Sequence, residues 1–254
     1  MLEMIVTAAI IILAVKLAAV AINSPSRIGA RGERAVAGRL RDGLPDEYLI
    51  LNDTYLPLQD GSTTQIDHIV VSQYGIFVVE TKTYSGWIFG NENSAKWTQT
   101  IYHCKHSFQN PIRQNYRHIC ALSSNLNIPK DYFKSVVAFT GDCDFRTEMP
   151  DGVVYSRKAA QYIRSFTTPM IKTSQIPEIA SAIQEWQGTI SEERKKSHVQ
   201  NLKHRHSDAR ADSPAPICPF CGGDMIIRHR RSDGTAFYSC REYPNCKGIV
   251  NIAK

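Results

Sequence analysis

The clearest pattern of hydrophobic and polar positions lies between residues 65 and 82, QIDHIVVSQYGIFVVETK. Two segments rich in β-branched and aromatic residues, 66–71 and 76–79, flank a short stretch that contains Gly75. A short glycine-containing connection between two such segments predicts an antiparallel β-hairpin. Acidic residues inside so strongly strand-forming a sequence need a chemical reason.

The predicted hairpin brings polar residues of its two strands onto one face. With the turn midway between the two segments, Asp67 lies opposite Glu80 and Gln65 lies opposite Lys82. Side chains alternate between the faces of a strand, so all four share one face.

Two directly opposed carboxylates destabilise a hairpin unless a cation lies between them. The Cβ atoms of Asp67 and Glu80 would be roughly 4.5–5.5 Å apart, which suits joint binding of one metal ion. Such oxygen ligands favour Mg²⁺ or Mn²⁺. The ammonium of Lys82 could then orient a water molecule or stabilise a charged transition state. This face is interpreted as a metal-assisted phosphodiesterase site.

The alternative for Asp67, Glu80 and Lys82 is the solvated side of an ordinary amphipathic hairpin. The register also depends on the loop, because a change of one residue in its length would move the two carboxylates to opposite faces.

A helix is predicted from a cap at Ser26 to about Leu40. One stripe of it, at helical spacing, contains Gly29, Gly32, Glu33, Val36, Ala37 and Leu40. Glu33 therefore points inward, where a glutamate must be neutral, paired or functional. The alternative is a glutamate at the edge of the stripe that reaches solvent or pairs with an arginine.

Further elements follow from the same patterns. Strands are predicted at 48–51, 135–140 and 153–155, and a closing helix at 177–186. Asn110–Pro111 predicts the start of a helix that continues to about Leu126. Its buried side is expected to carry Ile112, Tyr116, Ile119, Ser123 and Leu126, with Gln114, Arg117 and His118 outside that stripe.

The loop-rich stretch 84–97 contains three aromatic residues, Trp87, Phe89 and Trp97. They can stack on nucleobases or pack a hairpin against the core, and the packing role is favoured.

Several of these motifs, in this order over roughly residues 29–140, resemble the nuclease-related domain (NERD) within the PD-(D/E)XK nuclease superfamily. The matching pieces are Gly32–Glu33, QIDHIVV at 65–71, GIFVVETKTYSG at 75–86 with Trp87, Lys96–Trp97, and Asn110–Pro111 followed by Gln114. The resemblance implies an α/β fold, a restriction-endonuclease-like mixed sheet flanked by helices.

The same resemblance implies a set of active-site roles. Asp67 and Glu80 would hold Mg²⁺ or Mn²⁺, Lys82 would assist the attacking water, and Glu33 would support the metal or the nucleophile. Gln114 would help to position the substrate.

Residues 4–22 are almost unbroken apolar sequence, interrupted by Lys16. Such a run is long enough to cross a ~30 Å hydrocarbon layer as a helix. A cleaved signal peptide is the main alternative, although the segment lacks a basic region before it, and a buried soluble helix is a third. Arginines follow at once, so an anchor would leave the rest of the chain on the cytoplasmic side of the cell membrane.

The totals fit one medium α/β domain with a small accessory module. The chain has 254 residues, of which 43% are hydrophobic and 21% charged, which excludes an overall disordered or fibrous protein. A net charge of +6 is compatible with a polyanionic partner. The predicted division is an anchor at 1–24, the nuclease-like domain at 25–187, a basic polar linker at 188–213 and a metal-binding module at 214–254.

Four of the seven cysteines lie close together in that last module, Cys218, Cys221, Cys240 and Cys246. Paired thiolates at turn spacing predict a closed tetrahedral zinc site with a structural role. Two structural disulfides are the alternative. The other cysteines are scattered, which is typical of reduced thiols in a reducing compartment.

The sequence around these cysteines resembles the four-cysteine zinc finger of type I topoisomerases, in its CPxCGG, Gly-x-x-Phe-x-x-Cys and Tyr-Pro-x-Cys motifs. That resemblance implies binding of single-stranded DNA. The residues expected to contact nucleic acid are Arg228, Arg230, Arg231, Phe237, Tyr238 and Lys247.

Together these features favour a membrane-anchored, divalent-metal-dependent nuclease acting on DNA. The competing hypothesis is a non-catalytic nucleic-acid-binding adaptor that uses the same fold and finger. RNA remains open as a substrate, as do strandedness and oligomeric state.

Overall fold

The computed structural model describes residues 25–58, 62–102, 104–189, 218, 224–230, 235–241, 243 and 246–251. The predicted anchor at 1–24, Cys221, Arg231 and all of the predicted linker except residues 188 and 189 lie outside the described residues. Among the described helices, none is long and apolar enough to span a membrane.

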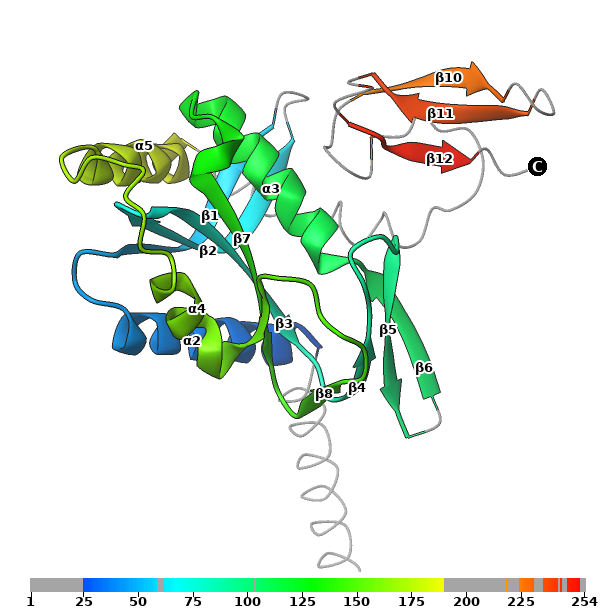
Figure 1. The fold of residues 1–254 in the computed structure, drawn as a ribbon, viewed down its shortest axis with the longest axis horizontal. Coiled ribbons are helices and arrows are strands. Elements are labelled where there is room, and N and C mark those ends of the chain that lie inside the picture. Colours follow the sequence, from blue (N-terminus) through cyan, green and yellow to red (C-terminus); the bar gives the residue numbers. More distant parts are fainter. Residues whose placement is uncertain are drawn as a thin grey trace, which may run out of the picture.

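The nuclease-like region is built on a five-stranded mixed sheet (Figure 1). The strand order is β1-β2-β3-β7-β9, in which β1, β2 and β3 are antiparallel and β3, β7 and β9 run parallel. These strands are β1 (Leu49–Pro57), β2 (Thr63–Ser72), β3 (Gly75–Thr83), β7 (Phe133–Thr140) and β9 (Val153–Tyr155).

Helices cover both faces of this sheet. Val36 and Leu40 of α2 (Pro25–Gly43) pack on one face, together with Ile163 of α4 (Ala159–Arg164). On the other face, Leu122 of α3 (Pro111–Leu126) and Ile183 of α5 (Gln175–Thr189) close the second core. The alternating apolar residues of β2 and β3 feed both cores, which explains why these strands are apolar almost throughout.

A smaller sheet extends from the end of β3 (Figure 1). Its order is β6-β5-β4-β8, with β4 and β8 parallel and the other pairs antiparallel. The strands are β4 (Gly86–Phe89), β5 (Lys96–Ile101), β6 (Cys104–Gln109) and β8 (Cys143–Phe145). Trp97 of β5 is 1% exposed and stacks on Phe139 of β7, so it packs the small sheet against the large one.

Two asparagines hold α3 in place. Asn110 caps its N-terminus, and Asn115 binds it to the sheet. Asn110 caps the helix by accepting a hydrogen bond from the Ile112 N–H, and its Nδ2 donates to the Ser94 carbonyl at 2.7 Å. Asn115 is fully buried and donates to the Val78 carbonyl at 2.7 Å and to Ser135 Oγ at 2.9 Å. The bonds of Asn115 tie α3 to β3 and β7, and the predicted start and end of this helix are confirmed.

The cysteine-containing module is a separate three-stranded sheet of order β10-β11-β12. Its strands are β10 (Met225–His229), β11 (Ala236–Cys240) and β12 (Ile249–Asn251), all antiparallel. Two short 3₁₀ helices complete the described elements, η1 (Lys130–Tyr132) and η2 (Ser156–Lys158).

The mixed α/β class and the predicted hairpin are confirmed. The smaller sheet beyond β4, and α4, were not expected. β8 has three residues and pairs with a strand more than fifty positions earlier, so no local pattern marks it.

Candidate active site and zinc module

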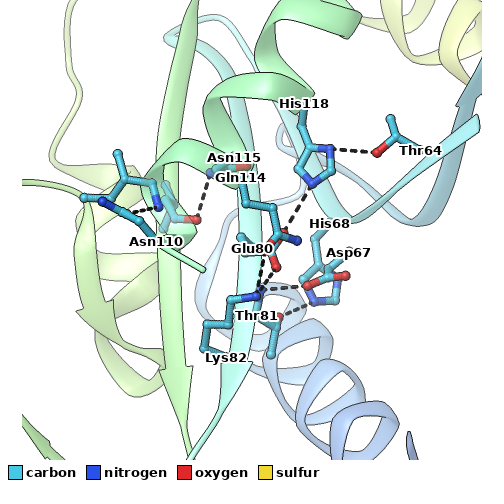
Figure 2. A network of polar contacts seen from close by, with 12 residues as sticks. Thr64, Asp67, His68, Glu80, Thr81, Lys82, Asn110, Gln114, Asn115 and His118 are labelled. Carbon is cyan, nitrogen blue, oxygen red and sulfur yellow. Dashed lines mark hydrogen bonds and ion pairs between the residues drawn. The ribbon is translucent and has the colours of Figure 1, made fainter. Parts of the chain in front are cut away.

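The site begins where the pairing of β2 and β3 ends. The register runs from Ser72↔Gly75 to His68↔Val79, as the turn predicted, and then stops. Beyond this point the Thr81 N–H donates to Asp67 Oδ2 at 2.7 Å (Figure 2). A carboxylate thus replaces a backbone carbonyl as the partner of β3, and Asp67 is held beside Glu80.

Neither predicted opposition, of Asp67 to Glu80 or of Gln65 to Lys82, is formed as a strand pair. Gln65 pairs with Tyr55 of β1 and accepts a hydrogen bond from its hydroxyl at 3.2 Å. The reason is the end of the β2–β3 ladder at His68, which separates the two strands before residue 65.

Lys82 lies between an acid of its own strand and an amide of α3. Its Nζ donates to Glu80 Oε1 at 2.7 Å and to Gln114 Oε1 at 2.9 Å (Figure 2). The side chains of Lys82 and Glu80 are 16% and 4% exposed. Three residues singled out in the sequence are therefore brought together in a largely buried ion pair with an amide partner.

The surroundings of Asp67 and Glu80 shift the pKa values of these two carboxyl groups in opposite directions. Burial and the charge of Glu80 raise the pKa of Asp67 well above its usual range, against the opposing Thr81 N–H. Burial would also raise the pKa of Glu80, but Lys82 and His118 outweigh it and lower this pKa to about 2. Lys82 is itself buried, yet Glu80 raises its pKa and keeps it protonated.

Glu33, on α2, lies close enough to interact electrostatically with Glu80. Gly32 allows this close approach, because a Cβ there would lie 1.8 Å from Thr83 Oγ1 on β3. Glu33 is half-buried, and its pKa is raised by burial and by the negative charges of Asp53 and Glu80. The predicted inward orientation thus brings Glu33 within electrostatic range of the β3 acid.

Asp53 is an acidic residue that sequence reasoning missed. It falls between the pairs Asn52↔His68 and Thr54↔Ile66, opposite Asp67, and is skipped by the β1–β2 ladder. Its φ of 51° departs from strand geometry, and its Oδ1 accepts a hydrogen bond from Gln65. A left-handed residue inside a strand has no periodic signature.

His118 was expected outside the buried stripe of α3, but it is buried. The predicted stripe is confirmed only in part, because Ile119 is buried whereas Ile112, Tyr116, Ser123 and Leu126 are half-buried. His118 is 5% exposed, and its Nε2 lies 3.4 Å from Glu80 Oε2, while Nδ1 lies 3.2 Å from Thr64 Oγ1. The buried positions of the helix are Pro111, Asn115, His118, Ile119 and Leu122. The spacing of apolar residues does not predict the burial of Asn115 and His118, because both are buried through polar contacts.

His68 occupies the opposite face of the hairpin. Its Nδ1 lies 2.8 Å from Asn52 Oδ1, and its Nε2 lies 3.2 Å from Thr81 Oγ1. Burial lowers its pKa to about 4, so the imidazole is neutral at pH 7. His68 steadies Thr81, whose N–H in turn binds Asp67.

The donor set suits a hard divalent cation. Asp67 and Glu80 offer carboxylate oxygens, the ligands that Mg²⁺ and Mn²⁺ prefer. Glu80 Oε2 is buried and, among the described residues, has no hydrogen-bond partner of normal length. The raised pKa of Asp67, caused by burial and by the charge of Glu80, is what a bound cation would relieve.

The predicted aromatic residues separate into two environments. Trp97 is buried and Phe89 half-buried, as expected for packing. Trp87 is 46% exposed, and the Arg146 guanidinium lies 4.5 Å from the centroid of its ring.

The zinc module brings three of the four predicted ligands together. The sulfurs of Cys218, Cys240 and Cys246 lie within 4.8 Å of one another and are buried. The 3.6 Å between the sulfurs of Cys218 and Cys246 is close to the about 3.8 Å of a tetrahedral zinc site with Zn–S bonds of about 2.3 Å.

The predicted nucleic-acid contacts lie on different faces of this module. Arg228 pairs with Phe237 across β10 and β11, and the Arg230 guanidinium lies 5.3 Å from the Phe237 ring centroid. Tyr238 packs against the cysteine cluster on the other face. Lys247 is exposed. Arg228, Arg230 and Phe237 thus share one surface, from which Tyr238 is turned away.

Comparison with known proteins agrees with this architecture. The family model of the nuclease-related domain matches residues 28–140, and that of the topoisomerase DNA-binding C4 zinc finger matches residues 215–254. An uncharacterized protein of Bacillus anthracis is 34% identical over 185 residues, which cover 71% of this chain and 86% of that protein. No solved structure matches the chain. The chain therefore belongs to the nuclease-related domain family and ends in a C4 zinc finger of the topoisomerase type.

Proposed function

We propose that this protein is a divalent-metal-dependent nuclease that hydrolyses phosphodiester bonds in DNA. The observation that carries the proposal is the convergence of Asp67, Glu80 and Lys82 at the end of the β2–β3 ladder, with Gln114 bound to the lysine. The family membership supports a nuclease-like, DNA-binding protein.

Each residue has a chemical role that follows from its surroundings. Asp67 and Glu80 would hold Mg²⁺ or Mn²⁺, which supplies Lewis-acid activation of water and neutralises phosphate charge. Lys82, with its raised pKa, remains a cation and would donate to a phosphoryl oxygen rather than accept a proton. Glu33, whose pKa is also raised, is suited to accept a proton from the attacking water.

The test is cleavage of plasmid and single-stranded DNA by the purified full-length protein with Mg²⁺ or Mn²⁺. Glu80→Gln and Lys82→Ala should each remove most activity, and the exposed control Lys172→Ala should retain it. Equal cleavage by all of these proteins would assign the activity to other residues. Salt-sensitive binding of DNA without turnover would favour the adaptor hypothesis.

We further propose that the zinc finger binds single-stranded DNA through Arg228, Arg230 and Phe237. Two guanidinium groups beside an aromatic ring are suited to phosphates and to a stacked base. Phe237→Ala should weaken binding of a labelled single strand more than binding of the matching duplex, measured by fluorescence anisotropy. An equal loss for both would refute the preference.

The membrane location is likewise proposed from the apolar run at 4–22 and the arginines that follow it. The protein should stay with the cell membrane after carbonate washing, with its C-terminus protected from protease added outside. Release into the soluble fraction would refute a retained anchor.

A further inference from the structure

We propose that His118 is a positioning residue of this site, which holds the Glu80 carboxylate in place through a relay that begins at Thr64. The inference rests on the proposed function, because it gives Glu80 the role of a metal ligand. Its basis is the line of contacts from β2 through α3 to β3 (Figure 2).

The two oxygens of the Glu80 carboxylate face different partners. Its Oε1 accepts the 2.7 Å hydrogen bond from Lys82, whereas its Oε2 faces His118 Nε2 at 3.4 Å. Both of these facing atoms are buried, and within the described residues neither has a partner at normal hydrogen-bond distance. Each of these two atoms is therefore the polar partner of the other, and the Glu80 carboxylate is held by Lys82 at one oxygen and by His118 at the other.

The acid that His118 faces determines which ring nitrogen carries the hydrogen. A carboxylate oxygen can only accept, so the contact with Glu80 requires that Nε2 of His118 carry the hydrogen. In the neutral ring Nδ1 is then an acceptor, and the Thr64 hydroxyl at 3.2 Å can donate to it. Thr64 thereby favours the tautomer that faces the acid, as partners of histidine rings do in other sites.

His118 is not needed to attach α3 to the sheet. Asn115 lies one turn earlier on α3 and already binds the Val78 carbonyl and Ser135 Oγ, so the helix is anchored without His118. His118 instead contacts two side chains, Thr64 and Glu80, and in the described part of the chain neither contact is to the backbone. The contacts of His118 therefore orient the Glu80 side chain, whereas Asn115 attaches α3 to the sheet.

The experiment measures Mn²⁺ binding by the full-length protein, by electron paramagnetic resonance of free Mn²⁺, alongside DNA cleavage. His118→Leu should weaken Mn²⁺ binding about 10- to 100-fold, the usual effect of losing a partner behind a metal ligand. His118→Gln, which keeps an N–H donor, should recover most of the affinity. Asn115→Ala is the matched control, and it should lower the unfolding temperature while leaving Mn²⁺ affinity within about twofold.

The Thr64 pair keeps the test decisive if the histidine variants fail to fold. Thr64→Val removes the hydroxyl at nearly constant shape and should weaken Mn²⁺ binding, whereas Thr64→Ser should bind as the wild type does. Wild-type affinity in both His118→Leu and Thr64→Val would overturn the positioning role, and so would a loss in His118→Leu that His118→Gln repeats in full.

The two proposals fail in different ways. A wild-type protein that binds no Mn²⁺ would overturn the metal site and this role together. A protein that binds Mn²⁺ and responds to the His118 and Thr64 variants, but cleaves no DNA, would overturn the nuclease activity and leave the positioning role in place.

Discussion

In the ion pair of Lys82 and Glu80, the free-energy cost of burying two charges is set against the attraction between them. We consider Lys82→Met, which keeps the length of the side chain and removes its charge. Glu80 would then remain buried without its 2.7 Å partner. Lys82 and, after it, His118 lower the pKa of Glu80 from 4.5 to about 2 against the effect of burial. Because a tenfold change in proton affinity is worth about 1.4 kcal/mol, this net shift corresponds to roughly 3 kcal/mol. Breaking a buried pair costs about 3–5 kcal/mol in other proteins, which is the same range.

The sign of the pH dependence follows from the direction of this pKa. Glu80 binds protons less tightly in the folded chain, so its stabilisation is fully present above about pH 4.5 and is lost as the pH falls toward 2. In Lys82→Met burial dominates and the pKa of Glu80 rises, so the variant should lose most stability near neutral pH and least in acid.

The assay is urea unfolding between pH 3 and pH 7 without added divalent metal, in protein lacking residues 1–24. Trp87, Trp97 and Trp186 all lie before the zinc module, so tryptophan fluorescence reports on the nuclease-like domain. We expect a loss of about 3 kcal/mol at pH 7, and within 0.5 kcal/mol of no change for the exposed control Lys172→Met. The same loss at pH 3 as at pH 7 would refute the pairing argument.

Replacing both partners completes this test. Glu80→Gln alone should also destabilise, since it leaves the Lys82 ammonium buried with only Gln114. The double variant removes both charges, and its loss should be smaller than the sum of the two single losses by about 2 kcal/mol or more. Additive losses would show that the two side chains act independently.

The charge of Asp67, the backbone at Gly141 and the zinc ligand Cys240 can each be altered by a single substitution. Asp67→Asn should raise the unfolding temperature of the metal-free protein at pH 8 and flatten its fall with rising pH, because the raised pKa of Asp67 means that ionisation destabilises the folded state; thermal unfolding from pH 5 to pH 8 measures both. Gly141→Ala, at φ 94° and with Tyr84 O 2.4 Å from the added Cβ, should cost about 1–3 kcal/mol in urea unfolding, whereas Gly38→Ala in the open part of α2 should stabilise slightly. Cys240→Ser should lose zinc, measured with a chromogenic chelator, without changing the tryptophan-monitored unfolding of the nuclease-like domain.

Local patterns predicted the elements that local chemistry defines. The turn at Gly75 determined the β2–β3 register, and Asn110–Pro111 marked the start of α3. The same reasoning placed Asp67 beside Glu80. It failed for His118 and Asn115, because an apolar periodicity treats every polar residue as exposed, whereas these two are buried by partners on β2, β3 and β7 that only the fold brings near. Burial of polar residues is decided by distant partners, which one sequence does not display.

The place where the hairpin stops pairing explains why the charged site can exist in an apolar sheet. On one side, β3 continues as a parallel partner of β7 to the end of the strand, through Glu80↔Val137 and Lys82↔Phe139. On the other side, the ladder with β2 has ended, and the freed Thr81 N–H is available to Asp67. The pairing with β7 fixes the backbone that carries Glu80 and Lys82. On the β2 side, where the pairing has ended, there is room for the carboxylate of Asp67, so the site is rigidly supported without a second backbone ladder. Lengthening the β2–β3 pairing by a single step would direct that N–H to a carbonyl and displace the acid.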